Sequence, residues 1–299
     1  MAYTATAVAD WDSTKPVGTE TPSALDDALR EVKVCVENDV RTTTQIQNDA
    51  AASVPGLVIR SKYTYSTTSA ILIDPGIYHH QGTTEQTVFW DTQLTFTFGS
   101  GGSNSDSVDL AGADWFYLYL DDSAIVTLGA NTILTNSEFV ANITEPTWTV
   151  GSHAWMNGND RCIGGFYVNG SNNIVEFFHD GGDQYSYADE IEDLALTDID
   201  DTWTDVTLTI PKFSTKASVT LHTADTAAGA AISCYWRTNG QSGSTGHLIG
   251  SAVNSGDEAA MNECRVFSDS SQIIEVRKAS AGLQRIGALT NGYYFPAGM

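Results

Sequence analysis

The feature that most constrains the fold is a change of periodicity along the chain. Leu25, Leu29, Val32 and Val36 recur at spacings of four, three and four, which places an apolar stripe on one face of a helix. From about residue 58 onward, apolar residues alternate with polar ones or form short runs between turn residues. The sequence therefore predicts a mainly β protein preceded by a short N-terminal α-helix.

The helix is expected within residues 21–50. Thr21 can cap its N-terminus, and Pro22 suits the first helical position. The apolar stripe is as narrow as a coiled-coil seam, so we interpret its four residues as an oligomerisation seam. The alternative is that this face packs against the β-structure of the same chain. Residues 1–20 show no helical repeat and are expected to form an extended arm that becomes ordered against a partner.

The strongest strand signals lie in residues 58–185, which we predict to be a first β domain. Residues 92–98 alternate with a period of two and place Leu94, Phe96 and Phe98 on one side. Residues 115–120 are apolar on both faces, which is typical of a strand in the middle of a sheet. Residues 160–168 and 173–178 predict a hairpin, because Asn169 and Gly170 between them favour a tight turn.

Two further segments complete the predicted organisation. Residues 186–202 are acidic and poor in strand-forming residues, so we expect a linker there. Residues 203–299 return to the alternating pattern in short segments, which predicts an antiparallel β-sandwich of jelly-roll type. The expected fold class is thus an arm and a coiled-coil-like α-helix, followed by two antiparallel β-sandwich-type domains.

The charge is strongly negative and unevenly distributed. The formal net charge is −23, and residues 63–211 contain 22 acidic residues but a single basic one, Arg161. Residues 212–299 contain 7 basic and 6 acidic residues. An acidic surface repels nucleic acid and anionic membranes, so neither is an expected partner. Two interpretations of the acidic surface are open. It keeps the protein soluble at high local density, or it binds cations or a basic partner.

The expected site of synthesis is a reducing cytoplasm. The first residues lack the basic and apolar regions of a secretory signal, and no apolar run is long enough for a membrane span. Cys35, Cys162, Cys234 and Cys264 are widely spaced among apolar residues, which favours buried thiols. A Cys234–Cys264 disulfide within one sandwich is the alternative.

Residues for catalysis or metal binding are not singled out by any motif. Asp198, Asp200 and Asp201 resemble part of a calcium loop but lack its glycine and distal glutamate, so a solvated acidic segment is the simpler interpretation. His79 and His80 are adjacent, and in a strand their side chains point to opposite faces. We therefore expect no enzyme activity, no catalytic residue, no metal site and no cofactor.

Aromatic side chains are the other group of residues considered for ligand binding. Six tryptophans fall in the β region: Trp90, Trp115, Trp148, Trp155, Trp203 and Trp236. Most are expected in the core, whereas an exposed ring beside polar residues would make a sugar-stacking site. The sequence alone does not identify which residues would contact a glycan.

Two segments resemble known proteins. Trp11 and Pro16, followed by residues 24–33 (ALDDALREVK), resemble the opening of many tailed-bacteriophage fibre and fibre-like virion proteins. Residues 155–164 (WMNGNDRCIG), with residues 174–178 (IVEFF) after them, are similar to a segment that follows that helix in the same proteins. The resemblance covers roughly the first 180 residues.

The resemblance implies a structural virion protein. It implies an N-terminus, with Trp11 and Pro16, that anchors on a portal, adaptor, tail, neck or capsid protein. It also implies a homotrimeric body that projects as a tail or head fibre, with a host-surface glycan as a further candidate partner. The chain lacks the long β-helix of large tailspikes. A carbohydrate-binding or receptor-binding adhesion module is the second hypothesis, and a glycan hydrolase with two carboxylates is the third.

Overall fold

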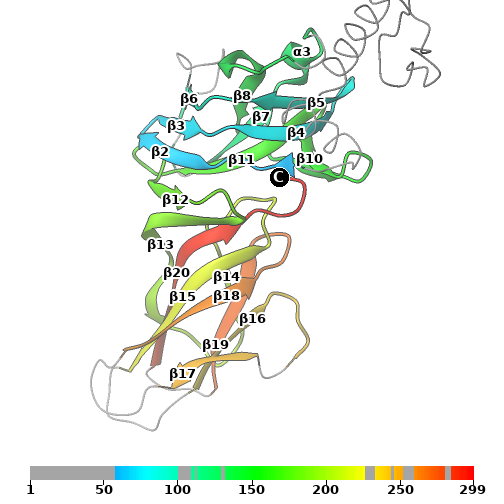
Figure 1. Cartoon of the computed structure of the whole chain (residues 1–299). Coiled ribbons are helices and arrows are strands. Elements are labelled where there is room, and N and C mark those ends of the chain that lie inside the picture. The colour runs from blue at the N-terminus through cyan, green and yellow to red at the C-terminus, as the bar shows by residue number, and fades with distance from the viewer. Residues whose placement is uncertain are drawn as a thin grey trace, which may run out of the picture. The chain divides into compact units, whose positions relative to one another are not determined.

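The computed structural model describes residues 58–99, 109–110, 112, 114–128, 132–225, 233–243, 246–251, 259–279 and 284–299. Contacts divide the chain into two compact units, residues 1–53 and residues 54–299. The arm expected at residues 1–20 and the helix expected at residues 21–50 lie outside the described residues. The second unit is mainly β-structure and contains several antiparallel sheets, which confirms the β class (Figure 1).

The first group of elements lies between residues 58 and 168. In chain order it consists of β1 (Val58–Ile59), β2 (Tyr63–Thr67), β3 (Ala70–Ile73), β4 (Gly76–Gln81), β5 (Glu85–Trp90), β6 (Leu94–Thr97), β7 (Asp114–Leu120), α3 (Asp122–Ile125), the 3-10 helix η2 (Asn136–Glu138), β8 (Phe139–Asn142), β9 (Thr147–Thr149), β10 (Ala154–Asn157) and β11 (Asp160–Val168). The strands form a sheet in the order β8-β7-β11-β10-β9 and two smaller sheets, β1-β4-β5 and β2-β3-β6.

The two strands with the clearest sequence signals form as predicted. Strand β7 pairs with β11 on one side and β8 on the other, and its residues 116–120 are buried. Strand β6 buries Phe96, and Phe98 just beyond the strand is buried as well. Threonines occupy the alternate positions of β6, because successive side chains point to opposite faces.

The second group of elements begins at residue 177. In chain order it consists of β12 (Phe177–His179), β13 (Gln184–Asp198), β14 (Thr204–Thr207), β15 (Lys216–Asp225), β16 (Ser233–Thr238), β17 (His247–Ser251), β18 (Ala259–Phe267), β19 (Ile273–Lys278) and β20 (Gln284–Tyr294). These strands form one sheet in the order β12-β13-β20-β15-β18 and a second sheet in the order β14-β19-β16-β17.

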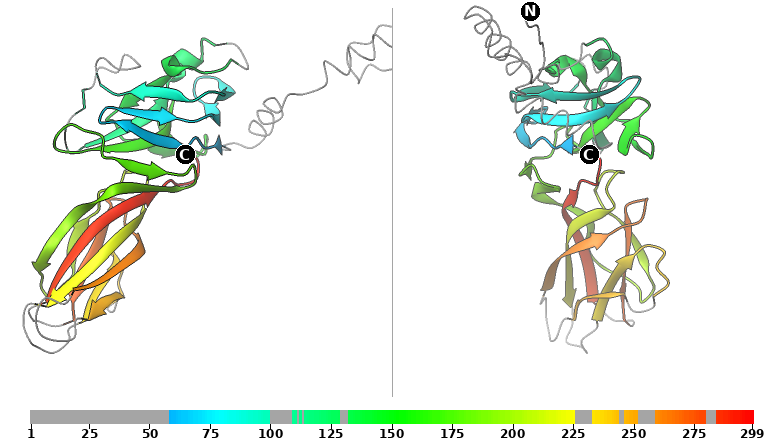
Figure 2. Two further views of the ribbon diagram at one scale, coloured as in Figure 1. Left: turned by 60° about the vertical axis from the view of Figure 1, so that its left-hand side comes forward. Right: turned by 45° about the vertical axis from the view of Figure 1, so that its right-hand side comes forward.

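The last eight of these strands have the order of a jelly roll. Numbered from β13, one sheet reads 1-8-3-6 and the other reads 2-7-4-5, which is the order produced by two Greek keys. The views in Figure 2 show the strands of the two sheets as layers. Leu221 and Ile286 from the first sheet and Val206 and Ile274 from the second belong to the same buried cluster. Alternating apolar residues thus supply the core of this part of the chain.

The acidic segment at residues 186–202 is not the linker that its composition suggested. Most of it belongs to β13, a strand that pairs with β20 from Gln184 to Asp198. Irregular register interrupts this pairing at three places, so the alternation of apolar and polar residues is broken along the strand. The eight-stranded arrangement therefore begins near residue 184, not at residue 203.

The hairpin expected around Asn169 is only partly present. Val175 N donates to Tyr167 O at 2.9 Å, and an isolated bridge joins Val168 to Ile174. Beyond this turn the chain leaves β11, and β12 pairs with β13 instead. The turn prediction was correct, whereas the prediction of the strand partner was wrong.

A shared aromatic core connects the two groups of strands. Tyr63 and Phe166 come from β2 and β11, and Tyr185 and Tyr293 come from β13 and β20; all four are fully buried. Tyr185 stacks on Tyr293 with ring centroids 4.6 Å apart, and Phe166 lies 6.3 Å from Tyr185. Because each ring removes a large apolar area from water, this core joins the two groups without an intervening linker.

Candidate functional site

The site residues proposed from the N-terminal sequence cannot be placed. Trp11, Pro16 and the seam residues Leu25, Leu29, Val32 and Val36 all lie outside the described residues. Their assigned roles in anchoring and oligomerisation therefore stay predictions. In the described part of the chain, no helix is long and apolar enough to cross a membrane.

Of the aspartates considered for calcium, Asp198 contacts a lysine. Its Oδ1 accepts a hydrogen bond from Lys278 Nζ at 2.5 Å. Among the described residues, no three His, Cys, Asp or Glu side chains are grouped in a way that could hold a metal ion. The described cysteines, Cys162, Cys234 and Cys264, are thiols.

His79 and His80 lie next to each other in β4 and are both buried. Their side chains contact different carboxylates. His79 Nε2 donates to Glu85 Oε1 at 2.9 Å, whereas His80 Nε2 donates to Asp122 Oδ1 at 3.0 Å. This divergence is the one expected for neighbours in a strand.

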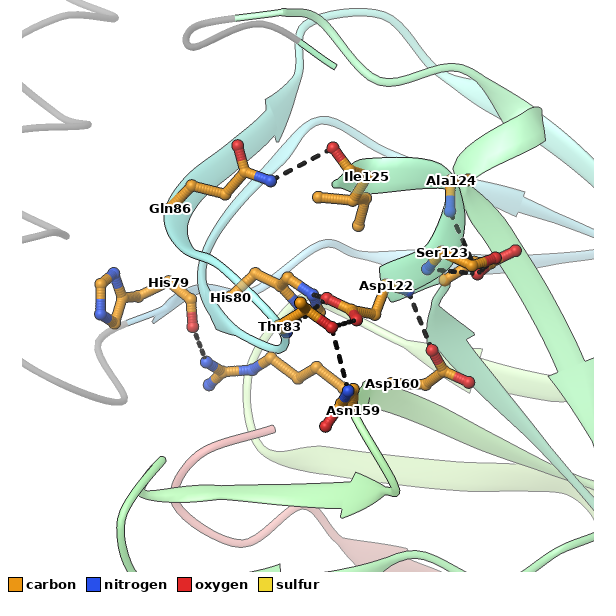
Figure 3. Close-up of polar contacts among 12 residues, drawn as sticks. His79, His80, Thr83, Gln86, Asp122, Ser123, Ala124, Ile125, Asn159 and Asp160 are labelled. Atoms are coloured by element: carbon orange, nitrogen blue, oxygen red, sulfur yellow. Dashed lines mark hydrogen bonds and ion pairs between the residues drawn. The ribbon is translucent and has the colours of Figure 1, made fainter. Parts of the chain in front are cut away.

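Asp122, which is buried, is the centre of a polar network (Figure 3). Besides His80, it accepts hydrogen bonds from Thr83 N at 2.8 Å and Thr83 Oγ1 at 2.5 Å. Burial disfavours its charged form, but the hydrogen bonds from Thr83 and His80 outweigh burial and lower the pKa of Asp122. Burial lowers the pKa of His80 despite its bond to Asp122, so the imidazole is held neutral.

The segment that resembles phage fibre proteins closes this network. Asp160 Oδ1 accepts a hydrogen bond from Asp122 N at 2.9 Å, and Asn159 Nδ2 donates to Thr83 Oγ1 at 3.0 Å. The turn between β10 and β11 is thereby joined to α3 and to the turn between β4 and β5 (Figure 3). The hydroxyl of Thr83 donates to the carboxylate of Asp122, so this geometry stabilises the turns that it joins.

Arg161 adds a buried charge beside the network. Its side chain is fully buried, and it donates to His79 O and, at 3.0 Å, to Gly298 O. Burial lowers the pKa of Arg161 to about 10. The guanidinium therefore fixes the segment around residue 298 against β4 through two backbone carbonyls.

A groove of about 380 Å³ lies along the paired strands β12 and β13. Phe178 and Ser186 are direct partners across these strands, and Asp180 and Gln184 are each two residues away from one of them. Since side chains alternate between faces, all four share the outer face. Phe178 is 64% exposed, which is high for a large apolar residue.

The opposite wall of the groove comes from β2 and the residue before it. Lys62 and Thr64 line this wall, and Tyr63 between them points into the core. Tyr63 N donates to His179 Nδ1 at 3.0 Å, and His179 Nε2 donates to Gly182 O at 3.1 Å. These two bonds fix the neutral tautomer of His179 and hold the two walls together.

A second groove, of about 530 Å³, has a different lining. It combines the partly buried rings of Tyr65 and Tyr167 with a set of acidic side chains. These are Glu176, Asp189, Glu190 and Glu192. Part of the acidic surface predicted from the sequence thus lies along β13.

Phe178, the exposed aromatic residue of the first groove, was not predicted from the sequence as a binding residue. The tryptophans were considered for stacking on sugars instead. Trp90 is 1% exposed and Trp148 is 42% exposed. A usable signal was the Phe177–Phe178 pair, because adjacent side chains in a strand point to opposite faces, and one of the two faces solvent wherever only one face of the sheet is covered. Phe177 is buried and Phe178 faces outward.

No protein-family model matches the chain, and no curated protein does. A chain from the solved "Structure of infectious bursal disease virus Gx strain" is 9% identical, with 81% of this chain and 73% of that chain covered. The TM-score of 0.19 is too low for this likeness to carry an argument.

Proposed function

We propose that this chain is a structural virion protein of a tailed bacteriophage. In this proposal it is a fibre or spike that attaches through residues 1–20, forms a homotrimer through the seam of Leu25, Leu29, Val32 and Val36, and projects its β-structure from the particle. The anchoring residues are Trp11 and Pro16, and the anchor partner is a portal, adaptor, tail or capsid protein. The protein is made in the host cytoplasm and resides in the virion.

The observation that carries the proposal is the shared aromatic core. A projecting element has to keep its parts in a fixed arrangement, and a continuous buried core does this better than a flexible linker. Phe166 of β11 lies 5.6 Å from Phe177 and 6.3 Å from Tyr185 between ring centroids, so the rings continue from one strand group to the next. The jelly-roll strand order also suits the proposal, because viral capsid proteins and lectins use this architecture.

The resemblance of the N-terminal sequence supplies the phage assignment. It rests on Trp11, Pro16 and residues 24–33, together with residues 155–164. The second of these segments contains Asn159 and Asp160, which bond to Thr83 and Asp122, and Arg161, which donates to His79 O and Gly298 O. A structural role for that segment is consistent with a resemblance that involves no catalytic residue.

The seam can be tested with the full-length chain. Leu29→Asp places a charge in the apolar stripe and is expected to dissociate the trimer, as measured by sedimentation. Arg30→Asp introduces the same residue at a position that faces away from the stripe and is expected to leave the assembly intact. An unchanged trimer in Leu29→Asp would show that the seam is assigned wrongly.

The place on the particle is tested separately. Antibodies raised against the β-structure are expected to label intact phage particles that contain the chain, and mass spectrometry should detect it in purified virions. If the chain is made during infection but is absent from purified particles, the virion proposal fails.

A further inference from the structure

We infer that the groove beside Phe178 is a carbohydrate-binding site for neutral sugars. The inference goes beyond the proposed virion role, because it concerns the ligand of one groove and holds whether or not the chain belongs to a particle. It starts from the 64% exposure of Phe178 on the outer face of the β12–β13 pair. An exposed phenyl ring inside a concave site provides a flat apolar surface on which a ligand can stack.

The side chains around the ring match a ligand rich in hydroxyl groups. Gln184 offers both a donor and an acceptor, the hydroxyls of Thr64 and Ser186 can do either, Lys62 donates and Asp180 accepts. A sugar ring combines an apolar C–H face with a rim of hydroxyls, and this lining combines a ring with a rim of small polar groups. The volume of about 380 Å³ lies within the range of small-molecule sites.

The charges of the groove favour a neutral ligand. Lys62 and Asp180 contribute one charge of each sign. The other side chains that we assign to hydrogen bonding are uncharged, namely Thr64, Gln184 and Ser186. An anionic or cationic ligand would find no excess of opposite charge there. The second groove differs, because its lining contains Glu176, Asp189, Glu190 and Glu192.

The groove is also rigid enough to be a preformed site. His179 and Phe177, which flank Phe178 in sequence, are both buried. Phe177 stacks on Tyr185 at 4.5 Å, and His179 accepts a hydrogen bond from Tyr63 N. Little conformational entropy is lost on binding when the supporting residues are already fixed.

The test uses the full chain and sugars of defined structure. Maltose, cellobiose, lactose and chitobiose are titrated in solution, so that multivalent display does not mask weak binding. The wild-type chain is expected to bind at least one of these sugars. Phe178→Ala is expected to weaken that binding at least about tenfold, whereas Phe178→Trp retains it.

Two further variants separate the groove from the rest of the surface. Gln184→Ala is expected to weaken binding several-fold, because an amide that contacts hydroxyls is lost. Phe267→Ala removes another exposed ring, which is 56% exposed on β18, and is expected to leave binding unchanged. Thermal melting of each variant shows that it is folded.

Three results would overturn the inference. The first is no binding of any of the four sugars by the wild-type chain. The second is equal binding by the wild-type chain and Phe178→Ala. The third is binding of an apolar dye that depends on Phe178 without any binding of sugars, which would identify a protein-docking surface. A monomeric chain that binds sugar through Phe178 would refute the trimeric fibre and leave this inference intact.

Discussion

The hydroxyl of Tyr293 donates a hydrogen bond to the carbonyl oxygen of Gly165 at 2.6 Å, across 128 residues of sequence. Tyr293 lies in β20 and Gly165 in β11, so this bond joins the two groups of strands inside their shared core. Both partners are buried, and the tyrosine is surrounded by aromatic rings, which include Tyr185 and Phe213. Burial raises the pKa of Tyr293, so its proton stays available for the bond at neutral pH.

We expect Tyr293→Phe to lower the free energy of unfolding by about 1–3 kcal/mol, because the carbonyl of Gly165 is left without its buried donor. Urea denaturation followed by fluorescence and by circular dichroism measures the change. Both probes should give one coincident transition, because the strand groups share a core. Phe178→Ala, which alters an exposed ring, should change stability by less than about 0.5 kcal/mol. Two separate transitions would show that the groups fold independently.

Arg161→Lys is expected to be more destabilising than Arg161→Met. Lysine keeps the cost of a buried charge but cannot donate to both His79 O and Gly298 O in the geometry of a guanidinium. Methionine loses the two bonds and also removes the charge, so the two effects partly cancel. We expect a loss of about 2 kcal/mol or more for the lysine variant. Wild-type stability of Arg161→Lys in urea titration would contradict this account of the guanidinium.

Stability should decrease as the pH falls below about 6.5, the ordinary pKa of histidine. Burial lowers the pKa values of His179 and His80 in the folded chain. At a pH between the lowered pKa and the ordinary histidine pKa, these two side chains are therefore protonated in the unfolded chain but not in the folded chain. Each histidine then costs up to about 1.4 kcal/mol at pH 5.5 relative to pH 7.5. Urea midpoints at the two pH values measure the loss.

His179→Gln measures how much His179 contributes to this pH dependence of stability. The variant should show a smaller difference between pH 7.5 and pH 5.5 than the wild type, and His247→Gln, at an exposed position, serves as the control. The comparison between variants is needed because burial raises the pKa values of Asp160 and Asp193, which stabilises the folded chain as the pH falls. An unchanged difference in His179→Gln would refute the role given to its neutral ring.

Gly292→Ala should be among the most destabilising substitutions in β20. A Cβ atom at this position would lie 2.0 Å from Tyr185 O, which is backbone and cannot move aside without breaking the pairing of β13 with β20. We expect a loss of more than about 3 kcal/mol. Gly158→Ala, in a left-handed turn with a φ of 61° and open space around it, should cost only about 1 kcal/mol. Similar melting temperatures for the two variants would contradict the predicted clash.

Part of the fold followed from local sequence pattern. Strand β7 was recognisable because residues 116–120 are all apolar, and β6 because Phe96 alternates with threonines. Such patterns depend on the direction of each side chain relative to one sheet, which is a local property. The antiparallel sandwich was predictable because short alternating segments are separated by turn-forming residues at regular intervals.

The errors arose where the structure depends on pairing between distant residues. Strand β13 contains Asp189, Glu190 and Glu192 beside irregular register, so neither its composition nor its period identified a strand. Charged residues are tolerated there because much of β13 has an outer edge on its sheet, and such charges discourage pairing with other chains. The Phe178 groove depends on the register of β12 with β13 and on the approach of Lys62, which no local pattern encodes.

The mass of the full-length assembly in solution tests the central claim most directly. Sedimentation equilibrium or native mass spectrometry of the 299-residue chain, whose single copy has a mass of 32.1 kDa, is expected to give three copies per particle. Arg30→Asp should give the same mass, and Leu29→Asp should give a single copy. A wild-type chain that remains monomeric across concentrations would contradict the account of a trimeric fibre.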